Sequence, residues 1–331
     1  MHDLVSIVIP VYNSEKTIGR LISILKQQTY DKIEVIIVND GSTDRTLSII
    51  TDSVDLDDRF KIFTKKNEGV SMARNFGISQ ITGKYVTFVD SDDLLLTNSI
   101  QLLLDNIRKS DSDFSIGSYT RTNSIINRTN FKGNYETSYI KKEEIKLKIL
   151  YPNKDNKFQN MNFRTVWGKL YKTRILRENS IQFPTGLKLF EDGLFNLLYL
   201  ENIENVSILE DTVYIYNVSE TSAVHKIYSD MPEIYDKIKS NLQNISLKHR
   251  NDGNEFVNYL NCCLFEFFCQ LLINNFKLGI KTQDTYSNNE EQIKDVISDI
   301  NPNQLTQKHR IVFYFLKYKL FQSLDFLVSL K

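Results

Sequence analysis

Three polar clusters follow short apolar runs near the start of the chain, and two of them are acidic. Asp40 lies directly after one run, and Asp90 and Asp92 lie directly after another. Two carboxylates spaced two residues apart at a strand end can bind a hard cation such as Mg²⁺ or Mn²⁺, which also accepts phosphate oxygens. Asp40 can accept hydrogen bonds from a base or a ribose. Acidic pairs are also frequent on solvated loops, so this pair alone is a weak indication of a metal site.

Other phosphate-binding chemistry is not indicated. No Gly-x-Gly-x-x-Gly follows the first apolar run, and the chain contains no Gly-Lys-Ser/Thr phosphate loop. These absences argue against a dinucleotide-dependent dehydrogenase and a P-loop NTPase. A nucleotidyltransferase would also need a glycine-rich, basic loop at this position, and Val11–Ser14 is not one.

The first hundred residues alternate between strand and helix patterns. Ser14 is expected to cap a helix over residues 18–25, Asp44 to open a second helix, and Val70–Ser79 to form a third. Continuous apolar runs predict strands at Ser6–Pro10, Ile33–Val38, Phe60–Phe63 and Tyr85–Val89. This order predicts an α/β fold with a parallel sheet covered on both faces. Ligands of such sheets bind at the carboxyl ends of the strands, where the polar clusters lie.

Beyond residue 112 the pattern changes. We expect a strand at Asp113–Tyr119, a polar hairpin or loop over 120–139, and a strand pair at Val206–Leu209 and Thr212–Tyr216. Helices are expected over residues 230–247, 254–277, 289–299 and 304–330. The predicted domains are 1–225, divided into 1–119 and 120–225, and a helical region 226–331.

Composition limits the classes of protein. The 331 residues carry 41 Lys and Arg against 41 Asp and Glu, so no global charge favours nucleic acid. The N-terminus has no basic and apolar leader pattern, and polar residues interrupt the apolar stretch Phe256–Phe276. A cytoplasmic location is therefore expected.

Several motifs together resemble a known family. They are SIVIPVYN (6–13), VNDGSTD (38–44), NEGVSMARNFGI (67–78) and FVDSDD (88–93), followed by WGKLY (167–171) and FEDGLF (190–195). Their order and spacing over residues 4–220 are similar to those of family 2 glycosyltransferases, which are inverting enzymes. The resemblance implies the GT-A fold, a Rossmann-like nucleotide-sugar domain with a central, mostly parallel sheet, followed here by a C-terminal helical region.

The resemblance also implies roles on the donor side. Pro10 and Tyr12 would line the base pocket, with Tyr12 stacked on uracil; the less favoured alternative for Tyr12 is an ordinary core aromatic residue. Asp40 would bind the uracil edge, and Arg74 would approach the nucleotide. Asp90 would contact the ribose or the donor sugar.

The diphosphate is expected to be held by a metal, Mn²⁺ or Mg²⁺, with Asp92 as its direct ligand and Ser91 beside it in the donor site. Many relatives carry an arginine after a Tyr-x-Tyr strand, whereas Tyr216 is followed here by Asn217. His225 and Lys226 are the candidates to replace it, and His225 is either a metal or phosphate ligand or a surface histidine.

On the acceptor side, the resemblance implies that Asp192 is the general base. Glu191 either raises the proton affinity of this base or, as we favour, marks the start of the following helix. Trp167 is either an acceptor-side residue or core filler. Asp44 is either a ligand contact or a helix-start residue favoured by the helix dipole.

The sequence therefore predicts a metal-dependent glycosyltransferase that moves a hexose, glucose or galactose with or without an N-acetyl group, from a UDP-sugar to a glycan hydroxyl. The glycan would be a lipid-linked chain, a polysaccharide or a glycoprotein. The alternative is a non-catalytic nucleotide-binding or scaffold subunit of a glycosylation complex.

The C-terminal segment 308–331 mixes lysines with aromatic residues. Such a helix can lie on an anionic membrane surface at the inner face of the cell membrane, or it can pack on the domain or on a second subunit as a homodimer. Packing is favoured, because the segment is apolar on more than one face.

The cysteines generate a first prediction. Cys262, Cys263 and Cys269 crowd into one helical segment, a spacing that suits buried thiols rather than a disulfide framework. The melting temperature should therefore be the same with and without dithiothreitol. A clear loss of melting temperature in the reducing buffer would contradict this interpretation.

Overall fold

A computed structural model describes residues 3–122, 137–152, 158, 160–218, 226–248 and 254–329 of the protein. The chain forms two compact units. The first comprises Met1–Ile145, Asn156–Gly186 and Glu191–Glu220, and the second comprises Lys146–Asp155, Leu187–Phe190 and Thr221–Lys331. The domain limits drawn from the sequence stay a prediction. Most of the expected polar loop at 120–139 lies outside the described residues.

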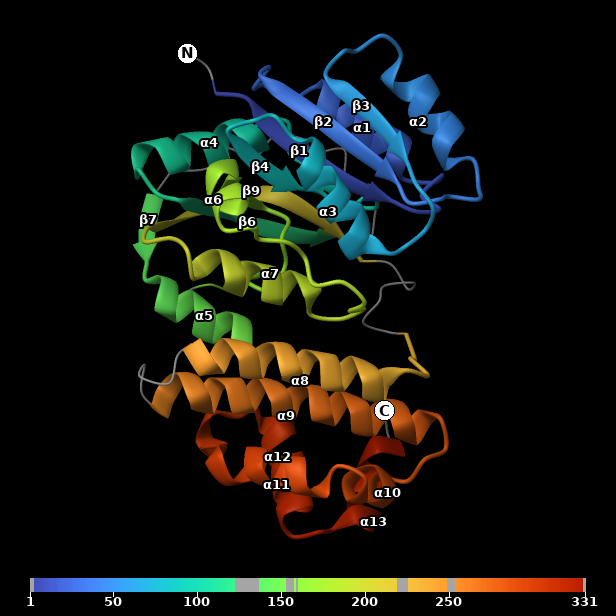
Figure 1. Cartoon of the computed structure of the whole chain (residues 1–331), viewed down its shortest axis with the longest axis vertical. Helices are drawn as coiled ribbons and strands as arrows, with labels where there is room; N and C mark the ends of the chain where they lie inside the picture. The colour runs from blue at the N-terminus through green and yellow to red at the C-terminus, as the bar shows by residue number, and fades with distance from the viewer. Residues whose placement is uncertain are drawn as a thin grey trace. The chain divides into compact units, whose positions relative to one another are not determined.

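The first unit is built on one sheet with the strand order β3-β2-β1-β4-β8-β6-β9-β5, and β7 pairs with β9 (Figure 1). Neighbours among β3, β2, β1 and β4 are parallel, whereas β8 runs antiparallel to both β4 and β6. The strands are β1 (Val5–Val11), β2 (Ile33–Asn39), β3 (Phe60–Thr64), β4 (Tyr85–Phe88), β5 (Leu94–Leu95), β6 (Phe114–Thr122), β7 (Thr137–Ile140), β8 (Lys169–Lys172) and β9 (Val206–Asn217). The α/β fold is confirmed, and its purely parallel part is the half that carries the nucleotide motifs.

Both faces of the parallel strands are covered, which explains their uninterrupted apolar sequences. Ile7 and Ile9 of β1 share a core with Leu21 of α1 and Leu103 of α4. On the opposite face, Val8 meets Gly77 of α3. The helices of this part of the chain are α1 (Ile18–Lys26), α2 (Thr46–Val54), α3 (Val70–Gln80), α4 (Ser99–Lys109), α5 (Lys142–Leu150), α6 (Thr173–Glu178) and α7 (Glu191–Leu200).

Two local predictions were wrong. Ser14 does not cap α1, because a turn separates it from the helix. The N-cap is Thr17, which makes no side-chain capping bond. The predicted strand pair near residue 210 is the single strand β9, which absorbs its irregularity through register shifts against β6.

The second unit is helical. Its elements are α8 (Met231–Lys248), α9 (Asn254–Lys277), α10 (Thr282–Ser287), α11 (Glu290–Asp299), the 3₁₀ turn η3 (Pro302–Gln304), α12 (Gln307–Lys317) and α13 (Phe321–Ser329). The single helix expected over 304–330 is divided, because Lys319 takes a left-handed conformation with φ of 56°. The short helix α10 was missed by the sequence pattern.

Helix α9 is the apolar centre of this unit. By length and composition it could cross a membrane, and 67% of its most apolar window is buried in the structure, as in the core helix of a globular unit. It packs against α8, α10 and α11. The three cysteines lie buried on it.

The aromatic C-terminal segment is only partly buried. Phe313, Leu316 and Leu324 pack inward, whereas Tyr318 and Phe326 are 63% and 65% exposed. The favoured prediction, that the segment packs on the protein, therefore applies to the inner residues of α12 and α13. Contact of the outer residues with a membrane or a second subunit stays a prediction.

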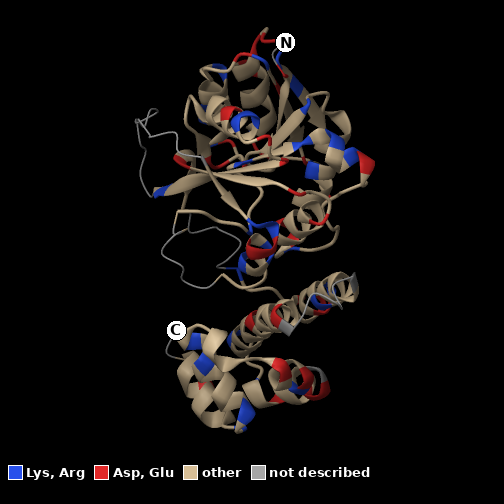
Figure 2. Ribbon diagram, turned by 90° about the vertical axis from the view of Figure 1, so that its left-hand side faces the viewer, with Lys and Arg blue, Asp and Glu red and all other residues tan. Residues whose placement is uncertain are grey.

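Charge is dispersed over each unit. Figure 2 shows Lys and Arg interspersed with Asp and Glu in both units, in line with the balanced composition.

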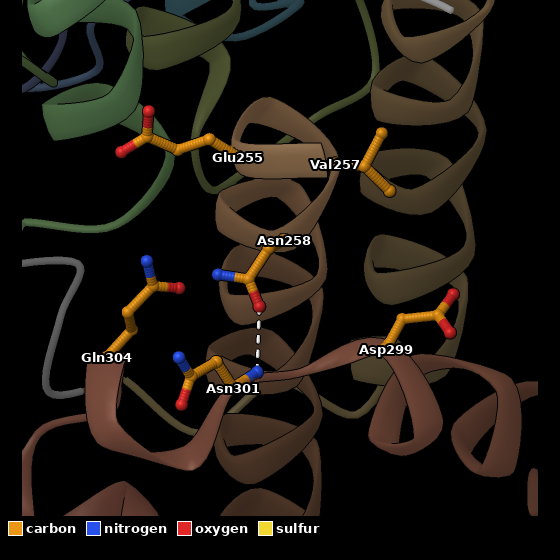
Figure 3. A pocket seen from close by; sticks show the side chains of 6 residues that line it. All are labelled: Glu255, Val257, Asn258, Asp299, Asn301 and Gln304. Atoms are coloured by element: carbon orange, nitrogen blue, oxygen red, sulfur yellow. Dashed lines mark hydrogen bonds between the residues drawn. The ribbon is translucent and has the colours of Figure 1, made fainter. Parts of the chain in front are cut away.

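The helical unit holds a cavity of about 650 Å³ beside α9. Asn258, Asn301 and Gln304 are among the residues that line it (Figure 3). The amide oxygen of Asn258 accepts a hydrogen bond of 2.8 Å from the backbone N–H of Asn301.

The contact between α3 and β1 yields a stability prediction. A Cβ at Gly77 would lie 2.4 Å from Val8 Cγ1, whereas one at Gly19 of α1 would meet its nearest atom, on Ile49, at 3.4 Å. Gly77→Ala should reduce the free energy of unfolding by about 1–3 kcal/mol through overpacking. Gly19→Ala is the matched control and should be neutral or stabilising by up to about 1 kcal/mol, because alanine favours helix.

Urea denaturation of the two variants measures both effects. Equal stabilities for Gly77→Ala and Gly19→Ala would show that α3 does not pack tightly on β1.

Candidate functional site

The parallel strands bring the predicted donor residues to one edge of the sheet. In the register of β1 with β2, Val11 pairs with Asn39, and in the register of β1 with β4, Val8 pairs with Phe88. Residues that follow these strand ends therefore emerge side by side. The loops that begin at Tyr12, Asp40 and Val89 form this edge.

The loops after β1 and β2 are tied together by hydrogen bonds. The amide oxygen of Asn13 accepts a bond of 2.8 Å from the backbone N–H of Thr43. The Asp44 carboxylate accepts bonds from the backbone N–H groups of Glu15 (3.2 Å) and Thr46 (3.0 Å). Of its two predicted roles, Asp44 therefore shows the helix-start role, at the beginning of α2.

Tyr12, Pro10 and Ser91 take different positions at this edge. The Tyr12 side chain is 49% exposed, which excludes the core alternative, whereas Pro10 is buried within β1. The Ser91 hydroxyl lies 2.7 Å from the hydroxyl of Ser14. Ser91 thus connects the loop after β4 to the loop after β1, and only Tyr12 offers an open aromatic face.

Asp40 is buried, and both of its carboxylate oxygens accept hydrogen bonds. One oxygen accepts from Lys65 Nζ (2.9 Å) and from the backbone N–H of Glu68 (3.1 Å), and the other accepts from the backbone N–H of Gly69 (2.8 Å). Asp40 therefore holds the turn that leads into α3. A nucleotide base bound by Asp40, as predicted, would share these carboxylate oxygens with Lys65 and the backbone of the turn. The sequence analysis missed Lys65, whose only signal is its position just before the NEG motif.

Arg74 is only 3% exposed and is surrounded by carboxylates. One terminal nitrogen lies 2.8 Å from Asp90 Oδ1, and the other lies 2.7 Å from Asp192 Oδ1 and 3.6 Å from Glu191 Oε1. The terminal nitrogens of Arg74 are therefore engaged with these acids, and its approach to the nucleotide stays a prediction. The resemblance pointed to Arg74 but not to these acidic partners.

The carboxyl groups after β4 differ sharply in environment. Asp92 is exposed and has no ion pair with any described residue, and partial desolvation and the charge of Asp90 raise its pKa. Asp93 is buried and accepts hydrogen bonds of 2.8 Å from the Tyr214 hydroxyl and from the Asn217 backbone N–H. Burial, with the charges of Asp90 and Asp92, raises the pKa of Asp93 to about 9. Asp93 was not predicted as a site residue, and it fixes β9 to this loop.

Asp92 fits the predicted metal ligand. Its carboxylate faces outward, and the charge repulsion that raises its pKa would be relieved by a cation. Mg²⁺ and Mn²⁺ are commonly held by one or two protein carboxylates together with substrate phosphates and water. Within the described ranges, no three His, Cys, Asp or Glu residues converge on a preformed metal centre. The arrangement suits a metal that arrives with a diphosphate.

Glu191 and Asp192 begin α7 at the same edge. The second carboxylate oxygen of Asp192 accepts a bond of 3.3 Å from the Val166 backbone N–H. Burial, followed by the charge of Asp192, raises the pKa of Glu191 to about 7. Burial also raises the pKa of Asp192, although Arg74 opposes this change. Glu191 therefore shows the predicted helix-start role, and its predicted effect on the proton affinity of Asp192 stays a prediction.

Trp167 lies beneath the site rather than on its surface. Its side chain is 5% exposed and stacks on Tyr214 with a centroid distance of 4.4 Å and an interplanar angle of 6°. The structure therefore favours the core role over direct acceptor contact. The neighbouring Lys169 is buried and donates a bond of 2.7 Å to the Asn162 carbonyl, and burial lowers its pKa to about 7. Sequence analysis missed Lys169, because a lysine within a strand pattern indicates an exposed position.

The replacement for the diphosphate-binding arginine is not located. His225 lies outside the described residues, and Lys226 is exposed. The Tyr-x-Tyr strand instead contributes Tyr214, whose hydroxyl accepts a bond of 3.2 Å from the Asp90 backbone N–H. This tyrosine connects β9 to the acidic loop.

Comparison with known proteins identifies relatives among sugar transferases. The family model described as glycosyl transferase family 2 matches residues 6–179. Glycosyltransferase GlyA of Streptococcus pneumoniae is 33% identical over 223 residues, covering 66% of this chain and 31% of GlyA. Poly(ribitol-phosphate) β-N-acetylglucosaminyltransferase TarS of Staphylococcus aureus is 28% identical over 291 residues, covering 84% of this chain and 47% of TarS. The chain thus spans about a third of GlyA and about half of TarS.

The fold has solved counterparts. The crystal structure of S. aureus TarS 1–349 in complex with UDP-GlcNAc matches with a TM-score of 0.66 and 23% identity, covering 98% of this chain and 90% of that chain. A mannosyltransferase of Pyrobaculum calidifontis in complex with GDP-Man and Mn²⁺ matches with a TM-score of 0.51 and 15% identity, covering 99% and 88%. At these identities the two structures support the fold alone.

The raised pKa of Glu191 predicts a pH-dependent stability. Its pKa rises from 4.5 in the unfolded chain to about 7 in the fold. Protonated Glu191 therefore favours the folded state. This contribution to the free energy of unfolding is complete below pH 4.5 and is lost as the pH rises through 7. When the pH rises from 5 to 8, the free energy of unfolding of the wild type should fall because Glu191 loses its proton. In Glu191→Gln this fall should be smaller by about 1–3 kcal/mol.

Chemical denaturation of the ligand-free protein at both pH values measures this difference. Glu233→Gln, in the first turn of α8, is the matched control and should follow the wild type. Identical pH profiles for Glu191→Gln and the wild type would show that Glu191 is not held in this environment.

Proposed function

Because the chain belongs to glycosyl transferase family 2, we propose that it is a metal-dependent, inverting glycosyltransferase that moves a sugar from a UDP-sugar to a hydroxyl of a growing glycan. One observation carries the proposal. The exposed Asp92 and the partly buried Asp192 lie at the same edge of the sheet, and Asp90 and Arg74 connect their two loops. A displacement at an anomeric carbon needs a metal at the departing diphosphate and a base for the attacking hydroxyl, on opposite sides of the sugar. Asp92 is proposed for the first function and Asp192 for the second.

The donor is proposed to be a UDP-hexose, glucose or galactose, with the N-acetylated form tested first. TarS is named as an N-acetylglucosaminyltransferase, and a crystal structure of TarS 1–349 contains UDP-GlcNAc. That relationship supports UDP-GlcNAc as the first donor. The exposed ring of Tyr12 offers a stacking surface for the base, because an aromatic face at the end of β1 is open to solvent.

Asp92 is proposed to hold Mn²⁺ or Mg²⁺ together with the diphosphate of the donor. When bound, such a metal neutralises the negative charge of the departing nucleotide. The protein contributes an outward-facing carboxylate on a loop that Asp93 fixes to β9. The rest of the coordination sphere is left for phosphate and water.

Asp192 is proposed to accept the proton of the acceptor hydroxyl as that oxygen attacks the anomeric carbon. Burial raises its pKa, which brings a carboxylate closer to the proton affinity that a general base needs at neutral pH. Its second oxygen is oriented by the Val166 backbone N–H. One displacement breaks the bond to the nucleotide and inverts the anomeric centre, so no covalent nucleophile on the protein is required.

The acceptor is proposed to be a hydroxyl of a cell-surface glycan, such as a lipid-linked chain, a polysaccharide or a glycoprotein. The acceptor named for TarS is poly(ribitol-phosphate), which supports a polymeric acceptor. A cytoplasmic location with peripheral membrane contact through α12 and α13 suits a lipid-linked acceptor and belongs to the same proposal.

Two carboxylate variants test the division of roles. Asp92→Asn should lose the Mn²⁺-dependent rise in melting temperature that UDP causes in the wild type, because the metal loses its protein ligand. Asp192→Asn should retain that rise and lose transfer on the order of 10²–10⁴-fold, because only the base is removed. Thermal shift with UDP and Mn²⁺ or EDTA, and radiolabelled sugar transfer, measure the two effects.

Asp52→Asn, on the exposed face of α2, is the control for a lost carboxylate. Unchanged transfer by Asp92→Asn would overturn the metal role. A wild type that shows no shift with any nucleotide would favour the scaffold alternative.

A further inference from the structure

Arg74 is the only described cation in contact with three acids of the site. Its terminal nitrogens contact Asp90 after β4 and Asp192 and Glu191 at the start of α7. Three segments that are far apart in the sequence, α3, the loop after β4 and α7, therefore meet at one guanidinium group. Through these contacts Arg74 connects the predicted base directly to the loop after β4.

The Arg74 guanidinium is held by an aromatic ring as well as by its ion pairs. Its central carbon lies 5.2 Å from the centroid of the Phe183 ring. The neighbouring Asn75 clamps Phe183 by accepting a bond of 2.8 Å from its backbone N–H and donating one of 2.9 Å to its carbonyl. Phe183 in turn stacks on Phe195 of α7 at 4.0 Å. The planar group is thus held in one orientation.

We propose that Arg74 is a positioning residue, which keeps the base Asp192 charged and fixes it relative to the donor-side Asp90, rather than a residue that binds the nucleotide. This inference rests on the proposed function, because it assigns a role within that reaction. The side chain is only 3% exposed and both of its terminal nitrogens contact carboxylates, which supports a role inside the site rather than at a nucleotide surface.

The charges around Asp192 make this role necessary. Asp192 faces Arg74 from α3, Glu191 from α7, Asp90 from the loop after β4 and the buried Lys169 from β8. Burial and the carboxylates favour the protonated form of Asp192, and a protonated Asp192 cannot accept a proton from the acceptor. Arg74 is the cation in direct contact, so its removal should leave the base protonated up to a higher pH.

Two substitutions separate charge from geometry. Arg74→Lys keeps a cation but cannot bridge two carboxylates with a planar fork, so kcat should fall on the order of 10²-fold through misplacement of the base. Arg74→Gln removes the charge, so the acid limb of kcat/KM should move to higher pH by about 1–3 units. In both variants the Kd of UDP with Mn²⁺, measured by calorimetry, should be unchanged.

Folding is controlled independently. Circular dichroism reports whether Arg74→Gln folds, and Arg59→Gln, which removes an ion-paired arginine at the start of β3, is the matched control. The double variant Arg74→Gln/Glu191→Gln removes one cation and one acid together. Its acid limb should return towards that of the wild type if charge on the base is the reason for the shift.

A readout without turnover separates this inference from the proposed function. Carbon-13 titration of labelled aspartate side chains, assigned with Asp192→Asn, should show a higher Asp192 pKa in Arg74→Gln than in the wild type. An inactive wild type that shows this shift would contradict the proposed function and leave only the effect of Arg74 on the protonation of Asp192. Weaker UDP binding with unchanged kcat, or an unchanged Asp192 pKa, would overturn the positioning role.

Discussion

The site depends on one buried cation among three carboxylates. Asp90, Glu191 and Asp192 would repel one another if they met without it, and the cost of burying charges would add to that repulsion. The Arg74 guanidinium offsets both effects with two ion pairs shorter than 3 Å and one of 3.6 Å. Because its partners come from two other segments, the same group connects three segments and opposes the effect of burial on the pKa of Glu191 and Asp192. Buried ion pairs add little net stability, so a network of this kind is better explained by chemistry than by folding.

The parallel half of the sheet explains why the donor residues lie where they do. Strands that run in one direction release their carboxyl ends at one edge, and each following loop there is free to carry polar side chains. The loops are then held in place by short hydrogen bonds among themselves, as between Asn13 and Thr43 or between Asp40 and Gly69. A rigid frame with polar loops can hold a flexible diphosphate without a dedicated glycine-rich loop.

The mixed half of the sheet contributes a second kind of support. Tyr214 of β9 accepts a bond from the Asp90 backbone and donates one to Asp93, while its ring stacks on Trp167. The acidic loop is therefore anchored to the core through a tyrosine and a tryptophan, and Asp92 is left as the outward-facing carboxylate. Within one short DSDD motif, burial gives one acid a structural role and exposure gives another the character of a metal ligand. This division supports the proposed binding of a metal together with the diphosphate of the donor.

The sequence by itself determined the strand and helix order of the first hundred residues, because continuous apolar runs and 3.6-residue periodicity are local properties of the chain. It also singled out Asp40, Asp90, Asp92 and Asp192 as candidates, through the resemblance of their motifs to those of family 2 glycosyltransferases. The partners of Arg74, the burial of Trp167 and Lys169, and the bond between Ser14 and Ser91 were decided by the tertiary structure. Each joins residues that are distant in sequence, and no local pattern encodes such a pairing. The break between α12 and α13 at Lys319 was also hidden, since a left-handed lysine has no compositional signal.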